Sequence, residues 1–253
     1  MILQRLATSI RKQDWFTVFI ETLIVVLGVF LGLQLGNWNE ARAERAQETE
    51  LLRALHQEIE TSIRLTDQKV DAIQQVVAAG KRSLDFLESD ESCGDECWNV
   101  LVDFFHASQW QSIEVDRSTY DEMRRQGFPR SRDIVDVVEG YLAQNATLSI
   151  TNEMPAYRSR VRQLIPFDAQ EFYWDNCYIL NDGAETYILD CAKGISDKAA
   201  ERAVGRIADT PDIPLLLTEW VGLHTATPAD LIVQNQTAEI ALEVIEAELE
   251  RRQ

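Results

Sequence analysis

An apolar stretch near the start of the chain, residues 17–38, limits what the protein can be more than any other feature of its sequence. The stretch reads TVFIETLIVVLGVFLGLQLGNW. At about 1.5 Å of rise per residue, a helix of this length spans the hydrocarbon core of a bilayer. We therefore predict a transmembrane helix over 17–38, preceded by a short tail, 1–16, and followed by a polar, helical domain, 39–253.

Small residues recur at every fourth position of the stretch, at Gly28, Gly32 and Gly36. Glycines at this spacing let two helix backbones approach closely in lipid, although glycine is also common in membrane helices in general. Glu21 shares one helical stripe with the first two glycines, and a carboxylate facing lipid is costly. The stripe therefore predicts a face covered by protein, unless Glu21 reaches the cytoplasmic headgroups. Gln34 falls on the opposite face near the far interface, where it could snorkel or meet another helix.

Charge on the two sides of the stretch predicts its orientation. The preceding tail carries three basic residues and one acid: Arg5, Arg11, Lys12 and Asp14. Charges of both signs follow the stretch. Since basic flanks stay in the cytoplasm, we expect the N-terminus there and residues 39–253 outside. A cleaved signal peptide is the alternative, with an A-x-A site over 41–43, but the stretch is long for a signal peptide and contains Glu21.

The segment 11–45, RKQDWFTVFIETLIVVLGVFLGLQLGNWNEARAER, carries a resemblance to a known family. It resembles the N-terminal signature of uncharacterised bacterial single-pass membrane proteins, a G-x-x-x-G-x-Q-x-x-NWNE run. The matching positions are Glu21, Gly28, Gly32, Gln34, Asn37, Trp38, Asn39 and Glu40. A second segment, 120–127, is similar to the family's Y-x-x-L-x-x-x-G, with Met123 in place of Leu. The resemblance implies an inner-membrane anchor and a helical periplasmic domain, and it implies no activity.

The chain is strongly acidic, with a formal net charge of −18. Such a charge repels nucleic acid and anionic lipid surfaces, so we expect no nucleic-acid partner. A solvated surface is the simplest explanation for the acids. A basic partner protein or divalent cations are the functional alternatives.

All four cysteines follow the apolar stretch. An even number of cysteines in an oxidising compartment predicts disulfides. Cys177 and Cys191 enclose two strand-like runs, 178–180 and 187–189, around a turn signal at 181–183. We therefore predict a β-hairpin that places these two cysteines opposite each other and bridges them.

The other pair, Cys93 and Cys97, forms a C-x-x-x-C in a predicted loop. This spacing could give a tight disulfide or a redox pair, although it is not the C-x-x-C of thioredoxin-like sites. A structural zinc site would need two more sulfur or nitrogen ligands nearby. We therefore predict no metal at this pair.

The rest of the chain is predicted to be mainly α, because apolar residues recur at helical spacing between charged faces. The predicted helices are a stalk over about 39–88, continuous or broken near Thr66-Asp67, then 96–108, 118–127, a helix capped by Ser131, 196–208, 215–223 and a last helix from Thr227. Pro155 predicts a kink or a new start within the helix that follows Ser131. We expect the last helix to pack antiparallel on the stalk, in a helical bundle with one small disulfide-linked hairpin.

The segment before Cys177 is rich in aromatic residues, among them Phe172, Tyr173 and Trp174. An aromatic cluster beside a disulfide is usually a local core, and it is also the best candidate for a binding surface. The three histidines, His56, His106 and His224, stand in no catalytic or metal-binding pattern. We therefore predict no catalytic residue, no cofactor and no enzymatic activity.

These observations favour a structural or accessory protein, anchored in a bacterial inner membrane, that binds a membrane-protein partner or itself through its transmembrane helix. Two alternatives stay open. One is a periplasmic sensor or regulator, which would signal through helix contacts to a partner protein. The other is a periplasmic ligand-binding protein or enzyme.

Overall fold

The computed structural model describes residues 15–89, 91–181 and 184–252. The predicted tail, 1–16, therefore lies almost wholly outside the described residues. The chain divides into two compact units, Met1–Leu51 and Leu52–Gln253. We call the second the folded unit. As predicted, the fold is mainly α with one small antiparallel hairpin.

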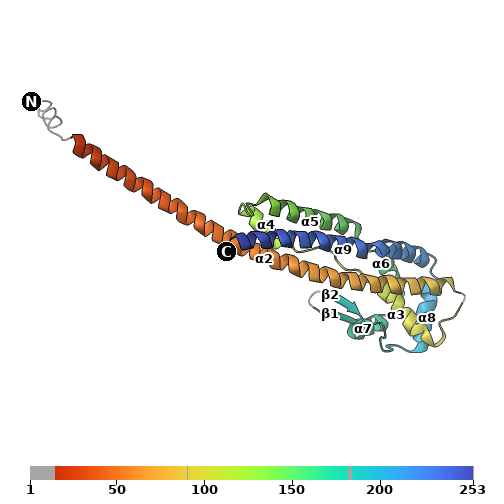
Figure 1. Ribbon diagram of the computed structural model, residues 1–253. Coiled ribbons are helices and arrows are strands. Elements are labelled where there is room, and N and C mark those ends of the chain that lie inside the picture. Colours follow the sequence, from red (N-terminus) through yellow and green to blue (C-terminus); the bar gives the residue numbers. More distant parts are fainter. Residues whose placement is uncertain (1–14, 90, 182–183, 253) are drawn as a thin grey trace, which may run out of the picture. The chain divides into compact units, whose positions relative to one another are not determined.

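The described elements follow one another in a simple order (Figure 1). They are α2 (Trp15–Glu88), η1 (Gly94–Glu96), α3 (Cys97–Ala107), α4 (Ser118–Arg125), α5 (Arg132–Thr151), α6 (Ala156–Arg162), α7 (Phe167–Asn176), β1 (Tyr178–Asn181), β2 (Ala184–Tyr187), α8 (Asp197–Ala208) and α9 (Ile213–Arg251). The predictions of helices over 96–108, 118–127 and 196–208 are confirmed within a few residues at their ends.

Helix α2 is continuous from Trp15 to Glu88, so the apolar stretch and the charged stalk form one helix, as predicted. The alternative break near Thr66-Asp67 does not occur. Thr66 is buried, and Asp67 accepts a hydrogen bond from Asn235 Nδ2 at 2.7 Å. Thr66 is therefore accommodated inside the bundle and Asp67 at its surface, and neither residue interrupts the helix.

Helix α9 runs antiparallel to the part of α2 that belongs to the folded unit, as expected (Figure 1). His56 Nε2 lies 2.9 Å from Glu246 Oε1 near the start of this pairing. Farther along α2, Asn235 reaches back to Asp67, and Gly80 faces Val221. Helix α5 packs along α9 and completes the long part of the bundle.

Separate helices over 215–223 and from Thr227 were predicted, and this prediction is wrong. Pro228 lies inside the single helix α9. Proline removes one backbone hydrogen bond and costs roughly 3 kcal/mol in a helix interior. Buried residues on both sides of it, such as Val221 and Leu231, gain more by packing on one straight surface.

Pro155 has the opposite effect, because here the helix does end. Helix α5 stops at Thr151, and α6 begins at Ala156 directly after the proline. This confirms the new start among the two predicted outcomes. Helix α7 was not predicted as a helix. It places the aromatic segment in the hydrophobic core that residues of α2, α3, α6, α8, α9 and the hairpin also form.

The hairpin has a different register from the predicted one. Tyr178 pairs with Tyr187, so the second strand begins at Ala184 and not at Tyr187. Only residues 182 and 183, an Asp-Gly pair outside the described residues, separate the strands. Asp-Gly is the preferred sequence of a two-residue hairpin loop. Cys177 is therefore opposite Ile188, whose amide donates to its carbonyl oxygen at 3.0 Å. Cys191 still bridges to Cys177, and Cys93 bridges to Cys97.

We expect the substitution Gly80→Ala to lower the free energy of unfolding by about 2 kcal/mol. A Cβ atom at Gly80 would lie 2.3 Å from the Cγ2 of Val221 on α9. Val221 is buried and its β-branched side chain has little rotamer freedom, so the two helices must separate. Urea unfolding followed by tryptophan fluorescence measures the change.

Gly140→Ala is the matched control for Gly80→Ala. Gly140 also lies inside a helix, but a Cβ there would meet nothing within 4 Å. Alanine should therefore stabilise this position by roughly 0.5–1 kcal/mol through helix propensity alone. Equal effects of the two substitutions would show that α2 and α9 are not in close contact at Gly80.

Candidate functional site

The apolar stretch of α2 forms an exposed surface on its own unit. Within the described residues, one helical segment, Phe19–Glu88, is long and apolar enough to cross a membrane, and no residue of its most apolar window is buried. Ile24, Val25 and Leu33 each expose more than three-fifths of their surface. A soluble protein rarely leaves a continuous apolar surface of this kind in water. The segment therefore lacks the burial that a core helix would have.

The residues predicted to pack against another helix in the membrane are not covered by other described parts of the chain. A Cβ atom at Gly28, Gly32 or Gly36 would meet nothing within 4 Å. Glu21 and Gln34 are also exposed. The close approach of another helix to the glycines is sterically free, and it stays a prediction.

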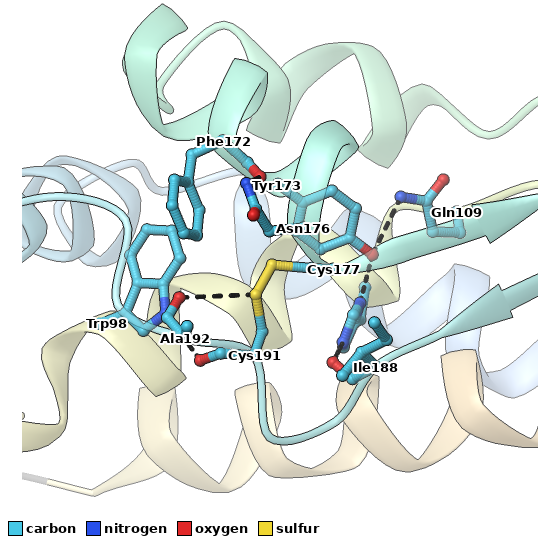
Figure 2. The surroundings of a disulfide bond; sticks show 10 residues. Trp98, Gln109, Phe172, Tyr173, Asn176, Cys177, Ile188, Cys191 and Ala192 are labelled. Carbon is cyan, nitrogen blue, oxygen red and sulfur yellow. Dashed lines mark hydrogen bonds between the residues drawn. A yellow bond between two sulfur atoms is a disulfide. The ribbon is translucent and has the colours of Figure 1, made fainter.

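The aromatic segment 172–174 packs in the core beside the Cys177–Cys191 disulfide. Figure 2 shows Phe172 and Tyr173 next to this bridge. Tyr173 is buried, and its ring lies 4.1 Å from that of Phe105. Phe172 packs edge-on against Trp98 at 5.7 Å, and Trp174 packs edge-on against a neighbouring strand residue. Trp98 in turn donates from Nε1 to the carbonyl oxygen of Cys191 at 3.3 Å. A role of these aromatics in binding stays a prediction.

A buried polar network lies beside this aromatic core. The two ring nitrogens of His106 contact the Tyr173 hydroxyl and the carbonyl oxygen of Ile188. Since a carbonyl only accepts, Nε2 carries the proton and Nδ1 accepts from the tyrosine. The Tyr173 hydroxyl also accepts from Gln109 Nε2 at 3.3 Å (Figure 2). Burial lowers the pKa of His106 to about 4, so the imidazole is neutral near pH 7. With both nitrogens engaged, His106 holds the hairpin to α3 and α7.

Two arginines on α6, Arg158 and Arg162, border the same network. Arg158 donates to the carbonyl oxygen of Ser108 at 2.9 Å, directly after the end of α3. Arg162 donates to the Ser108 hydroxyl at 2.9 Å and to Gln109 Oε1 at 3.0 Å, and it lies 4.6 Å above the ring of Phe105. Burial, with the nearby charge of Arg158, lowers the pKa of Arg162 to about 10. Cations at this place complement the negative end of the α3 dipole, which gives both residues a structural role.

Sequence reasoning did not find this arginine pair or the partners of His106. The R-x-x-x-R spacing at 158–162 places two like charges on one helix face, which is normally a solvated face. The partners of His106 lie 67 and 82 residues away in the chain. No local pattern links residues at such separations.

The other two histidines also have local structural surroundings. His224 is buried, with its ring centroid 3.5 Å from that of Trp220. His56 lies between Glu60 and Glu246 at the surface between α2 and α9. Among the residues the structure describes, no group of three or more His, Cys, Asp or Glu is arranged to hold a metal ion.

The sequence matches no family model, no curated protein and no solved structure. The resemblance of residues 11–45 to a bacterial membrane-protein signature therefore stays a prediction. The long apolar N-terminal helix is compatible with a membrane anchor, and the two disulfides suggest an oxidising compartment. The apolar helix and the disulfides are therefore the structural features that bear on the function of the chain.

Proposed function

We propose that the chain is a membrane-anchored accessory protein of a bacterial inner membrane. In this proposal, residues 17–38 cross the bilayer with the N-terminus in the cytoplasm, and the folded unit lies in the periplasm. The glycines of the anchor bind a membrane-protein partner or a second copy of the chain. The observation that carries the proposal is the apolar segment of α2, in whose most apolar window no residue is buried.

The free energy of covering this segment is large. Eleven large apolar side chains between Phe19 and Leu35 are exposed. At roughly 1.5–3 kcal/mol for complete burial of each, covering their exposed parts is worth on the order of 10 kcal/mol. A bilayer covers such a surface on all sides of the helix, whereas a protein partner covers one face. Membrane insertion is therefore the favoured way to bury it.

Two independent features support the orientation. The basic flank before the apolar stretch, with Arg5, Arg11 and Lys12, favours a cytoplasmic N-terminus. Both disulfides lie after the stretch, in the folded unit, and disulfides persist in oxidising compartments such as the periplasm. The charge pattern and the cysteine chemistry therefore support the same orientation, with the folded unit outside the cytoplasm.

Replacing Gly28 and Gly32 with Ile is expected to abolish the native assembly while the folded unit stays intact. The branched side chains separate helix backbones that glycine allows to touch. The full chain is extracted from membranes with a mild detergent and sized, and co-purifying proteins are identified by mass spectrometry. Wild type should retain the apolar stretch and run in a stoichiometric complex or homo-oligomer, and the variant should run as a monomer.

Leu23→Ile/Leu27→Ile is the matched control, because these residues lie on the face opposite the glycines and keep their hydropathy. The control should run at the wild-type size. An unchanged native size in the glycine variant would reject the glycine contact. A mature chain that lacks the apolar stretch and is soluble in the periplasm would reject the anchor itself.

A further inference from the structure

An apolar groove lies on the folded unit between the end of α5, the start of α6 and the first part of α9. It encloses about 600 Å³. The apolar residues that line it are Ile150, Met154, Tyr157, Leu216, Trp220 and Leu223. Tyr157 and Trp220 are buried and form its floor, whereas Ile150 and Met154 are 75% and 57% exposed on its rim. The groove therefore offers a buried aromatic floor and an exposed apolar rim.

The charges at the groove have one sign. Its charged lining residues are Glu153 and Glu219, and both are exposed. Neither forms an ion pair within the part of the chain that the structure describes. An apolar groove with two unpaired acids on its edge is complementary to a ligand that is apolar on one side and basic on the other.

We propose that this groove binds a basic amphipathic helix of a partner protein. The apolar face of such a helix fills the groove, as in other helix-in-groove complexes. Its Lys or Arg side chains lie along the rim with their charges next to Glu153 and Glu219. Met154 suits this role, because an unbranched thioether adapts to the shape of its partner.

Other occupants fit less well. A second copy of the chain also carries a net charge of −18, so it would approach the acidic rim against repulsion. An anionic lipid surface would be repelled by the same two acids. The proposal goes beyond the anchoring function and does not depend on it, because every lining residue belongs to the folded unit.

The test uses the full chain in nanodiscs of zwitterionic lipid and two labelled synthetic peptides of about 18 residues. Both peptides carry Leu at i, i+3, i+4 and i+7, and the remaining positions are Lys in one and Glu in the other. Fluorescence anisotropy measures binding, with empty nanodiscs as the blank. The Leu/Lys peptide should bind at least about tenfold more tightly than the Leu/Glu peptide, a difference of about 1.4 kcal/mol.

Charge exchange at the rim separates a specific groove from a general attraction to an acidic protein. Glu153→Lys/Glu219→Lys should reverse the preference between the two peptides. Glu239→Lys/Glu243→Lys changes the net charge equally at two exposed acids of α9 that do not line the groove, and it should keep the wild-type preference. Equal effects of the two exchanges would overturn the proposal.

Apolar contacts are tested in the same way. Ile150→Lys/Met154→Lys should weaken binding of the Leu/Lys peptide about tenfold, which corresponds to about 1.4 kcal/mol. Ile240→Lys alters an exposed apolar residue of α9 outside the groove and should leave the affinity unchanged. Unchanged circular dichroism shows that each variant is folded. Complete displacement of the peptide by decanoate would instead assign the groove to a small apolar ligand and would overturn the proposal.

Discussion

Lowering the pH from 7 to 5 is expected to reduce the free energy of unfolding of the folded unit by about 4 kcal/mol. The cause is a pair of buried histidines. Burial lowers the pKa of both His106 and His224 to about 4. In the unfolded chain both imidazoles regain a pKa near 6.5. Between these values the unfolded chain binds two protons that the folded chain does not, so acid favours unfolding.

The sign and the size of the effect follow from the same pKa values. The contribution of the two neutral histidines to the free energy of unfolding is fully present above about pH 6.5, and it is lost progressively as the pH falls towards 4. Each histidine contributes about 1.4 kcal/mol per pH unit in this window, or about 2 kcal/mol by pH 5. A hydrogen bond from the Ser118 amide lowers the pKa of Asp116 in the folded chain. Burial raises the pKa of Glu248, but hydrogen bonds from Arg252 and Arg251 and their charges outweigh this effect and lower it. These carboxylates lose their stabilising contribution only at still lower pH.

His224→Phe isolates one of the two contributions. The ring of His224 lies against that of Trp220, with the two ring centroids 3.5 Å apart. Phenylalanine keeps the ring contact and removes the titration. Urea unfolding at pH 7 and pH 5 should therefore show a loss of about 2 kcal/mol in the variant, against about 4 kcal/mol in wild type. Identical losses in the two proteins would show that His224 is not the titrating group.

The sequence was sufficient to predict the elements that local patterns determine. The apolar stretch and the charged periodicity after it predicted α2, because a helix needs only regular spacing of apolar residues. The helix predicted over 196–208 is α8, and the Ser196 hydroxyl accepts from the Ala199 amide as an N-cap does. Such elements depend on residues within a few positions of one another.

Errors arose where tertiary packing outweighs a local signal. Pro228 is a helix breaker by its own chemistry, yet burial on both sides keeps α9 continuous. In the hairpin, the symmetry of the sequence placed the centre of the strand pairing one to two residues late, because Tyr178 pairs with Tyr187. The predicted disulfide is nevertheless correct, because the residues that follow Tyr187 bring Cys191 back to Cys177.

The same distinction between local and tertiary signals applies to the candidate sites. The membrane stretch and its glycines could be named from spacing alone. The network of His106, Tyr173 and Arg162 could not, because its members come from three helices that only the folded chain brings together. The groove lined by Trp220 and Met154 is also invisible in the sequence. Apolar periodicity predicts which residues leave water, but it does not predict which of them a fold leaves uncovered.

Replacing Cys177 and Cys191 with Ala is expected to lower the free energy of unfolding by about 3 kcal/mol. The bridge closes a loop with a sequence separation of 14 residues and so limits the freedom of the unfolded chain. Both cysteines are buried in the aromatic core, where Trp98 donates to the carbonyl oxygen of Cys191. Their loss should loosen the hairpin and expose Trp98, which tryptophan fluorescence detects during urea unfolding at neutral pH.

Cys93→Ala/Cys97→Ala is the matched control, since it removes a bridge of sequence separation 4. The same loop-closure argument gives about 2 kcal/mol for this shorter loop. The control should therefore unfold at a higher urea concentration than the Cys177→Ala/Cys191→Ala variant, with a similar dependence on urea. The opposite order would mean that the tight bridge before α3 stabilises the folded unit more than the bridge that closes the hairpin. In that case the attachment of the hairpin would depend on the contacts of Tyr173 and His106 and not on its disulfide.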